Sequence, residues 1–228
     1  MSARRESRRD LFVLVGPMEK PVLLQDWVST ALSREHSVFF VGVDGGVDVL
    51  RRAKLPIGLA IGDWDSLRSH SILGEVTHVT LAEEKDRSDL HHALRAVAEL
   101  GAHRVIARGF QGGRMDHEWA AQLDFAVAAE NFRALTSLGQ RGTCHFLGTR
   151  AGKARSLTLT ALRKGQTLSL LPLEAVAGLH LEGLRFQAPG GILGISSQGL
   201  SNRVSRTPVR ISLRRGKLIV LIPSEGNV

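Results

Sequence analysis

Short apolar runs alternate with helical patterns in the first part of the chain. Five runs have the length of buried strands, at residues 11–15, 38–43, 57–61, 76–81 and 105–107. Apolar residues recur at helical spacing between them, in segments 21–32, 88–100 and 119–129. Pro21 opens the first helix, Ser88 caps the second and Gly101 ends it. Strands buried on both faces that alternate with helices are typical of a parallel, doubly wound α/β sheet.

The pattern changes after about residue 141, where apolar and polar residues alternate with a period of two. This alternation runs through residues 157–160, 167–170, 179–184 and 209–213, with Gly-containing turns between them. The predicted fold class is therefore α/β followed by β. A doubly wound, mostly parallel α/β domain is expected at residues 11–140, and an antiparallel β-sandwich or barrel at 141–228. The Arg-rich start, residues 1–10, is predicted to be disordered.

The positive charge of the chain is concentrated in its second part. Residues 1–140 carry 17 Lys and Arg against 19 Asp and Glu, a net charge of −2, whereas residues 141–228 carry 13 against 3, a net charge of +10. A solvated basic surface, a wall that faces a polyphosphate and a nucleic-acid surface all fit this charge. The chain has no Tyr, and only Phe146 and Phe186 follow residue 140. Because stacking platforms for RNA are missing, we do not expect a nucleic-acid partner.

The cysteine count and the apolar runs limit the class of protein further. A single cysteine, Cys144, excludes an internal disulfide framework, a zinc site built on cysteines and an iron–sulfur cluster. No apolar run approaches the ~20 residues that span a bilayer, and residues 11–15 are too short for a signal-peptide core. We therefore expect a cytoplasmic protein with no membrane partner.

Polar segments follow several of the predicted strands. Ligands of open α/β sheets bind beyond the carboxyl ends of the strands, so the acidic residues of these segments should converge at one edge. The segments are Asp44-Gly45-Gly46, Gly62-Asp63-Trp64-Asp65-Ser66, Glu84-Lys85-Asp86-Arg87-Ser88-Asp89 and Gly112-Gly113-Arg114-Met115-Asp116-His117.

Two of these segments offer carboxylates to a hard cation. Asp63 and Asp65 leave a strand two positions apart, as ligands of Mg²⁺ can, although Asp-x-Asp is also ordinary turn chemistry. Asp86 and Asp89 begin a helix, where acids complement the helix dipole or supply further metal ligands. In the metal-binding interpretation Lys85 contacts phosphate.

The segment from Gly112 to His117 points most clearly to an anion. Paired glycines before a helix let backbone N–H groups approach an anion, and Arg114 can hold phosphate oxygens bidentately. Asp116 can orient Arg114, bind metal or help to deprotonate a hydroxyl. His117 can bond at the site, or be an ordinary half-buried histidine. The glycines after Asp44 fit a tight connection from strand to helix that leaves room for a ligand.

In their order and spacing, these segments resemble the thiamine pyrophosphokinase family, over roughly residues 11–222. The family pattern reads Asp-Gly-Gly-Ala, Gly-Asp-Phe-Asp-Ser, Lys/Gln-Asp-x-Thr-Asp, Gly-Gly-Arg-x-Asp-His and, near the end, Ser-Asn. Here these are Asp44-Gly45-Gly46-Val47, Gly62-Asp63-Trp64-Asp65-Ser66, Lys85-Asp86-Arg87-Ser88-Asp89, Gly112-Gly113-Arg114-Met115-Asp116-His117 and Ser201-Asn202. The departures are Trp64 for Phe, Ser88 for Thr, Val47-Asp48 for Ala-Asn, and the lack of a C-terminal Trp.

The resemblance implies transfer of the β,γ-pyrophosphoryl group of ATP to the hydroxyl of thiamine, with Mg²⁺ as cofactor and AMP as the second product. It also implies a homodimer in which the β domain of one subunit lies near the α/β domain of the other. The implied metal ligands are Asp63, Asp65, Asp86 and Asp89. The implied catalytic residues are Asp44, Asp65, Arg114 and Asp116. The implied nucleotide contacts are Gly45, Gly46, Lys85, Gly112, Gly113, Arg114 and His117, and the implied thiamine contacts are Ser201 and Asn202.

Other functions stay open at the level of sequence. A related enzyme could pyrophosphorylate another heterocyclic alcohol, and a non-catalytic nucleotide- or RNA-binding protein could carry the same charge. A phosphatase of the haloacid-dehalogenase type also uses Asp-x-Asp after a strand. That class expects Thr or Val two residues beyond the second Asp, where this chain has Leu67, and it gives no reason for the segment around Arg114.

Overall fold

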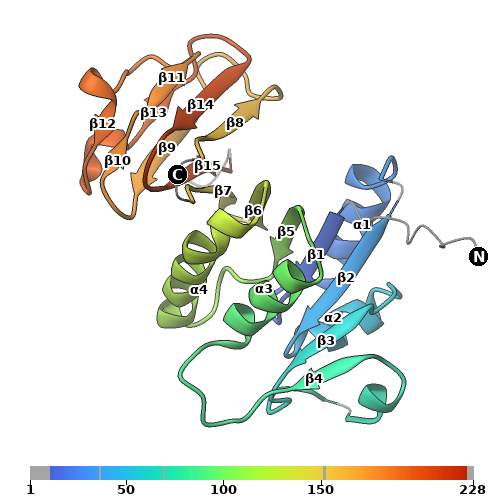
Figure 1. Ribbon diagram of the computed structural model, residues 1–228. Coiled ribbons are helices and arrows are strands. Elements are labelled where there is room, and N and C mark those ends of the chain that lie inside the picture. The colour runs from blue at the N-terminus through green and yellow to red at the C-terminus, as the bar shows by residue number, and fades with distance from the viewer. Residues whose placement is uncertain (1–10, 36, 69, 151–152, 225–228) are drawn as a thin grey trace, which may run out of the picture. The chain divides into compact units, whose positions relative to one another are not determined.

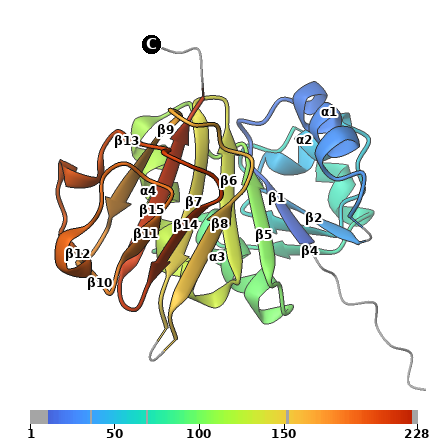
Figure 2. The same ribbon diagram turned by 90° about the horizontal axis from the view of Figure 1, so that it is seen from above.

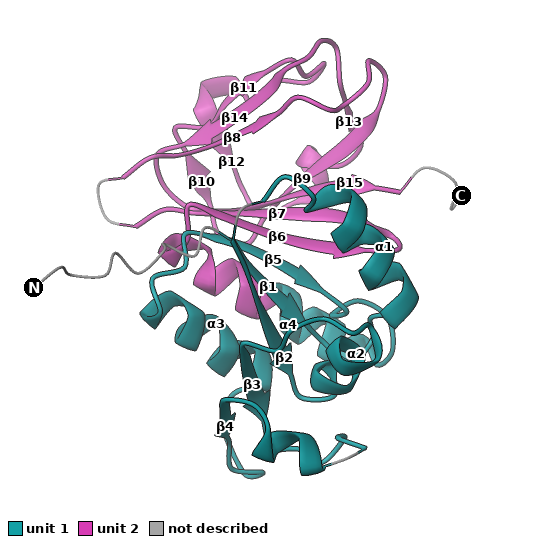
Figure 3. Ribbon diagram, turned by 90° about the vertical axis from the view of Figure 1, so that its right-hand side faces the viewer, with its two compact units in different colours: residues 1–122 teal, residues 123–228 magenta. Residues whose placement is uncertain are grey.

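The structure is a computed structural model that describes residues 11–35, 37–68, 70–150 and 153–224. The disorder expected for residues 1–10 falls outside these ranges. The chain divides into two compact units, the first ending at Gln122 and the second beginning at Leu123 (Figure 3). The boundary therefore falls within the helix α4 (Met115–Ala128).

The first unit contains a parallel sheet with strand order β5-β1-β2-β3-β4. Its strands are β1 (Leu11–Val15), β2 (Val38–Val43), β3 (Leu59–Gly62), β4 (His78–Thr80) and β5 (Arg104–Arg108). Every residue of β1 is buried, as a central strand covered on both faces requires. The chain moves outward from β1 to β4 and then returns to the other side of β1 for β5. The predicted doubly wound sheet is thus confirmed.

Helices cover both faces of this sheet. They are α1 (Pro21–Ala31), α2 (Gly46–Arg52), α3 (Asp89–Glu99) and α4, with a short 3₁₀ helix, η1 (His70–Gly74). Figure 3 shows α3 on one side of β1 to β3 and α1 and α2 on the other. Right-handed crossovers demand this arrangement, because the strand order reverses at β1. Pro21 is the first residue of α1, and the Ser88 hydroxyl accepts from His91 N at 3.0 Å, so both predicted helix starts are confirmed.

The second unit is antiparallel throughout the strand pairs within it. One sheet has the order β13-β9-β15-β7-β6, a second β11-β14-β8, and β10 pairs with β12 (Figures 1 and 2). The strands are β6 (Ala134–Gly139), β7 (Gly142–Gly148), β8 (Arg155–Leu159), β9 (Thr167–Pro172), β10 (Val176–Ala177), β11 (His180–Glu182), β12 (Ile192–Leu193), β13 (Asn202–Arg203), β14 (Val209–Leu213) and β15 (Lys217–Pro223).

One apolar core joins these sheets. It contains Leu168 and Leu170 of β9 and Val220 of β15 from the first sheet, and Val209 and Ile211 of β14 from the second. Two antiparallel sheets that share a core form a sandwich, so the predicted β architecture is confirmed. Strand β6 pairs with β7 within this unit, whereas the sequence pattern assigned residues up to 140 to the α/β domain. Residues 123–140 therefore group with the second unit, although the periodicity of the sequence changes only after residue 141.

The described ranges contain no helix that is long and apolar enough to cross a membrane. Cys144, the single cysteine of the chain, is buried in β7.

Candidate active site

The predicted segments of the first unit leave the sheet at one edge, because neighbouring parallel strands end together. Asp44 follows β2, and Asp63 follows β3. Asp44 N donates to Ile61 O of β3 at 2.8 Å, which holds the two strand ends side by side. Gly46 begins α2 against the end of β1, where a Cβ atom would lie 1.8 Å from Val15 O. Only glycine fits there, so Gly46 lets the helix start close to the strand edge.

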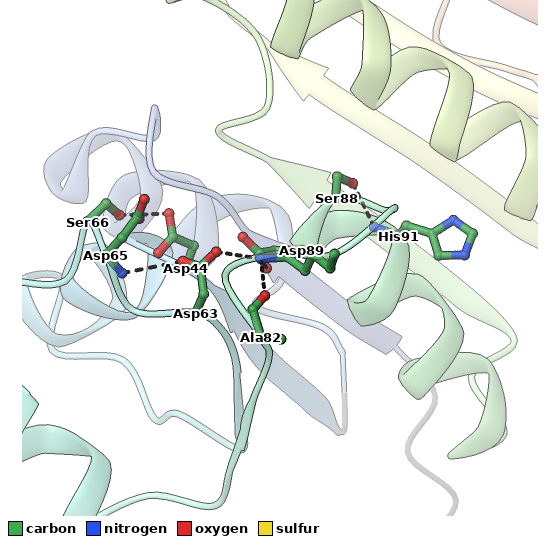
Figure 4. Close-up of polar contacts among 9 residues, drawn as sticks. Asp44, Asp63, Asp65, Ser66, Ala82, Ser88, Asp89 and His91 are labelled. Carbon is green, nitrogen blue, oxygen red and sulfur yellow. Dashed lines mark hydrogen bonds and ion pairs between the residues drawn. The ribbon is translucent and has the colours of Figure 1, made fainter.

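Three carboxylates meet at this edge. Asp44, Asp63 and Asp65 each offer an oxygen within 4.8 Å of the others, and Figure 4 shows them gathered from two loops. The Ser66 hydroxyl donates to Asp44 Oδ2 at 2.7 Å, and Asp65 N donates to Asp63 Oδ1 at 3.3 Å. These bonds fix the carboxylates relative to one another.

The backbone of the cluster is strained. Asp44 has a φ of 48° and Trp64 a φ of 70°, in the left-handed region that favours glycine. Trp64 is buried, and its Nε1 donates to Thr80 Oγ1 at 2.9 Å, so its ring anchors the loop between the two acids. Strain of this kind persists only where the surrounding structure imposes it, and it gathers at functional sites.

Neighbouring charges and burial shift the pKa values of several acids at this site. The negative charge of Asp63, then burial and the charge of Asp44, raise the pKa of Asp65. The hydrogen bond from Lys85 lowers the pKa of Asp63, although burial opposes it. Lys85 Nζ pairs closely with Asp63 Oδ2 and lies 3.2 Å from Asp89 Oδ1. Burial also raises the pKa of Asp89, against the effect of Lys85.

The donor set fits a hard divalent cation. It consists of carboxylate oxygens, and Asp44 Oδ1 is buried without a hydrogen-bond partner. Of the four predicted metal ligands, the structure brings Asp63 and Asp65 together and links Asp89 to them through Lys85. Asp86 is exposed and is not part of the cluster. Asp48, the acid that departs from the family pattern, is buried and accepts from Arg68 N at 2.8 Å, which ties α2 to the loop after Ser66.

A cavity of about 550 Å³ lies beside the cluster, entirely within the first unit. The predicted residues on its wall are Asp44, Asp89, Gly112, Arg114 and His117. The cavity wall thus brings together residues from three of the four predicted segments, and the cavity has the size of a small-molecule site.

The segment around Arg114 opens α4 at the cavity. Gly112 and Gly113 have φ values of 86° and 92°, which other residues adopt only with strain. Arg114 Nη2 lies 2.7 Å from Asp116 Oδ2, with both side chains largely exposed, and this pair raises the pKa of Arg114 and lowers that of Asp116. This ion pair is the contact that the predicted orienting role of Asp116 would use.

Sequence reasoning missed several residues of the cavity wall. Pro17 and Met18 follow β1, Phe110 follows β5, and Glu118 accepts from Gly112 N at 3.1 Å. The signal for Pro17 and Met18 was present, because the loop after the central strand must reach the same sheet edge as Asp44. Phe110 lies two residues before the predicted Gly112, and Glu118 is one residue beyond the predicted segment.

Ser201 and Asn202 lie in the second unit. Ser201 has a φ of 55°, and its backbone N donates to Ser169 Oγ at 3.0 Å. Asn202 is buried, and its side-chain amide bonds the backbone of Phe186 at both ends, accepting from N at 3.0 Å and donating to O at 2.9 Å. Asn202 therefore holds the segment at Phe186 in place.

Comparisons with known proteins agree with this arrangement. A family model described as "Thiamin pyrophosphokinase, catalytic domain" matches residues 31–133, and one described as "Thiamin pyrophosphokinase, vitamin B1 binding domain" matches residues 156–218. A search of curated protein sequences finds no match to this chain.

Solved structures share the fold over nearly the whole chain. The thiamine pyrophosphokinase of Geobacillus thermodenitrificans superposes with a TM-score of 0.75 at 21% identity, covering 95% of this chain and 99% of its own. The enzyme of Bacillus subtilis gives 0.73 at 20% identity, covering 95% and 100%. The enzyme of Candida albicans gives 0.69 at 15% identity, covering 94% and 90%. Since both domain models match in order along one chain of this fold, the protein belongs to the thiamin pyrophosphokinase family.

Proposed function

We propose that this thiamine diphosphokinase transfers the β,γ-pyrophosphoryl group of Mg²⁺-bound ATP to the hydroxyl of thiamine, and that the first unit carries the chemistry. The observation that supports this most directly is the meeting of Asp44, Asp63 and Asp65 beside a cavity that Arg114 also lines. Carboxylates for a cation and a guanidinium for phosphate are what phosphoryl transfer needs, because it depends on positioning and charge neutralisation.

The reaction forms one bond and breaks one. The thiamine oxygen bonds to the β-phosphorus, the bond from that phosphorus to the bridging oxygen of the α-phosphate breaks, and its electron pair leaves with AMP. The hydroxyl proton passes to a carboxylate, for which Asp65 and Asp116 are the exposed candidates. Arg114 binds phosphate oxygens in a geometry that Asp116 fixes.

Asp44, Asp63 and Asp65 would hold Mg²⁺, with Asp89 at the cavity wall behind Lys85. The ion would neutralise the charge that develops on the phosphate oxygens. The chain places Asp86 outside this group, so we assign it a supporting role only.

We propose a homodimer for the complete enzyme. Helix α4 carries exposed apolar side chains at four-residue spacing, Met115, Trp119, Leu123 and Val127. We call them the α4 stripe. A second exposed apolar group, the 186–200 patch, consists of Phe186, Ile192, Ile195 and Leu200.

The charges around these two surfaces are complementary. Helix α4 contains three acids and no Lys or Arg, whereas residues 185–206 contain three Arg and no acid. A two-fold dimer in which the α4 stripe of each copy meets the 186–200 patch of the other would bury both surfaces. Ser201 directly follows Leu200 of the patch, so in such a dimer it could contact thiamine held by the partner copy.

The decisive experiment measures AMP release from ATP with a panel of hydroxyl-bearing heterocycles, with and without Mg²⁺. We expect AMP and thiamine diphosphate to form in equal amounts, and only when both thiamine and the cation are present. Turnover with another alcohol but not with thiamine would overturn the acceptor, and ATP consumption that yields ADP would overturn the reaction. The cytoplasm is the compartment we propose, since the chain has a single, buried thiol.

A further inference from the structure

The amine of Lys85 is inserted among the carboxylates of the candidate metal site. It pairs closely with Asp63 Oδ2, lies 3.2 Å from Asp89 Oδ1, and donates to the backbone oxygen of Ala82 at 3.1 Å. The side chains of Lys85, Asp63 and Asp89 are 14%, 13% and 20% exposed. The ammonium group thus donates two hydrogen bonds and forms an ion pair with a third oxygen, in a partly desolvated site.

Lys85 is less exposed than its charged neighbours in the sequence. Residues 81–88 connect β4 to α3 without a helix or strand of their own, and Glu83, Glu84, Asp86 and Arg87 are all exposed. Only Lys85 among these charged neighbours is turned inward. A connection of this kind can change its conformation at lower cost than a helix or a strand.

The positive charge of Lys85 offsets the repulsion among the carboxylates of the cluster. Asp44, Asp63 and Asp65 lie within 4.8 Å of one another, and repulsion among carboxylates this close favours a cation between them. An ammonium group neutralises part of this negative charge when no metal is bound. It uses the same Asp63 carboxylate that a metal would use.

We propose that Lys85 is an internal counter-cation that holds the carboxylates together in the ligand-free protein and must leave Asp63 when the divalent cation binds. The inference rests on the proposed function, because it takes the acidic cluster as the metal site. Mg²⁺ requires near-ideal octahedral oxygen coordination at short distances, and an ammonium group bonded to the same carboxylate blocks it. Lys85 is thereby released toward the phosphates when metal and nucleotide arrive together.

The competition lowers the affinity for the metal in the absence of nucleotide. We call the ion pair between Lys85 and Asp63 the latch. The apparent affinity for the metal falls in proportion to the fraction of molecules in which this ion pair is open. A latch that is closed in nine-tenths of the molecules therefore weakens metal binding about tenfold. Lys85→Gln removes the cation while keeping a residue of the family pattern, and Lys85→Arg keeps a cation. Arg95→Gln breaks an exposed ion pair with Glu99 on α3 and serves as a matched control.

The first test measures binding of Mg²⁺, and of Mn²⁺ as a spectroscopic probe, to the full chain without ATP or thiamine. We expect Lys85→Gln to bind either ion about tenfold more tightly than wild type, and Lys85→Arg and Arg95→Gln to bind within twofold of it. Without metal, Lys85→Gln should also melt at a lower temperature than wild type and recover when the ion is added. Equal or weaker binding by Lys85→Gln would overturn the latch and leave the proposed function standing. Failure of every protein to bind either ion would overturn the metal site itself, and the latch with it.

The second test uses wild-type protein, so it does not depend on the folding of any variant. Acetylation of lysines by a water-soluble reagent, followed by peptide mass spectrometry, reports how accessible each amine is. Mg²⁺ should raise the acetylation rate of Lys85 several-fold while leaving exposed Lys164 unchanged. An unchanged or lower rate at Lys85 in saturating Mg²⁺ would contradict the release of its amine.

Discussion

The Ser66 hydroxyl donates a hydrogen bond of 2.7 Å to Oδ2 of Asp44, a residue 22 positions earlier in the chain. This bond connects the loop after β3 to the end of β2, and it leaves Asp44 Oδ1 buried with no partner of its own. Asp44 also adopts a strained backbone conformation. Ser66 is therefore a positioning residue that sets the direction of one carboxylate of the proposed metal site.

Replacing Ser66 by Ala should lower metal affinity and activity together. Loss of an outer-shell partner of a ligating carboxylate commonly costs 10–100-fold, and we expect a loss of about tenfold in each. Calorimetric Mg²⁺ binding and steady-state AMP release measure the two effects. Ser29→Ala in α1, which removes an exposed hydroxyl bonded only to the helix backbone, is the control. Unchanged Mg²⁺ affinity in Ser66→Ala would refute the positioning role.

Asp65→Asn should separate activity from stability. We expect AMP release to fall more than about a hundredfold, the range for loss of a key electrostatic group. The fold should be retained, because Asp65 is exposed. Near-normal turnover in the purified variant would defeat the assignment, and Asp26→Asn on the exposed face of α1 provides the comparison.

The same substitution has a consequence for the pH dependence of stability. Asp63, burial and Asp44 raise the pKa of Asp65 above its ordinary value of 3.8, so the folded protein binds this proton more readily than the unfolded chain. Without metal, wild type therefore loses stability as pH rises through the interval between these two pKa values. Asp65→Asn lacks this loss, and urea unfolding at several pH values in a chelator should show it. A steeper loss in the variant than in wild type would contradict the repulsion.

Asn202→Ala should destabilise the second unit. Both ends of the buried Asn202 side-chain amide bond the backbone of Phe186, and truncation removes these two hydrogen bonds, at a cost of about 1–3 kcal/mol in total. Ser201→Ala removes an exposed hydroxyl and should leave stability unchanged. If Ser201 contacts thiamine, its variant raises the KM for thiamine more than that for ATP. Denaturant unfolding tests the structural role of Asn202, and the two KM values test the binding role of Ser201. An unchanged unfolding midpoint in Asn202→Ala would refute the structural role.

The sequence is most informative where the local pattern and the tertiary environment agree. The fully buried strand β1 and the amphipathic helix α3, with its cap at Ser88, were predictable because burial of their apolar residues determines where they lie. Strands β6, β7 and β15 were not assigned, because Gly, Thr and Ser interrupt the alternation of the first two and the last is nearly continuous in apolar residues. Their place depends on pairing with one another.

The candidate site shows the same division. Topology alone brings Asp44 and Asp63 to one edge, since parallel strands end together. The partner of Lys85 could not be predicted, because the ammonium group of a lysine pairs equally well with a phosphate and with an internal carboxylate. The binding of Asn202 to the backbone at Phe186, 16 residues away, likewise depends on how a loop returns to β13.

Trp119→Glu tests the dimer at the centre of the α4 stripe. The Trp119 side chain is 62% exposed on a helix that already carries Asp116, Glu118 and Asp124. In the dimer, the introduced carboxylate would be buried in an apolar interface, and no nearby cation would offset the cost of removing it from water. In the monomer the same carboxylate stays exposed to water, so the substitution disfavours the dimer and not the fold. We therefore expect Trp119→Glu to be a folded monomer by light scattering where wild type is a dimer, with thiamine turnover reduced at least tenfold, the loss expected when a contact to the substrate is removed. Leu100→Glu, at an exposed apolar residue that directly follows α3, should remain dimeric and active. A monomeric wild type with full activity would remove the need for a partner subunit, and a dimeric, active Trp119→Glu would move the interface to another face.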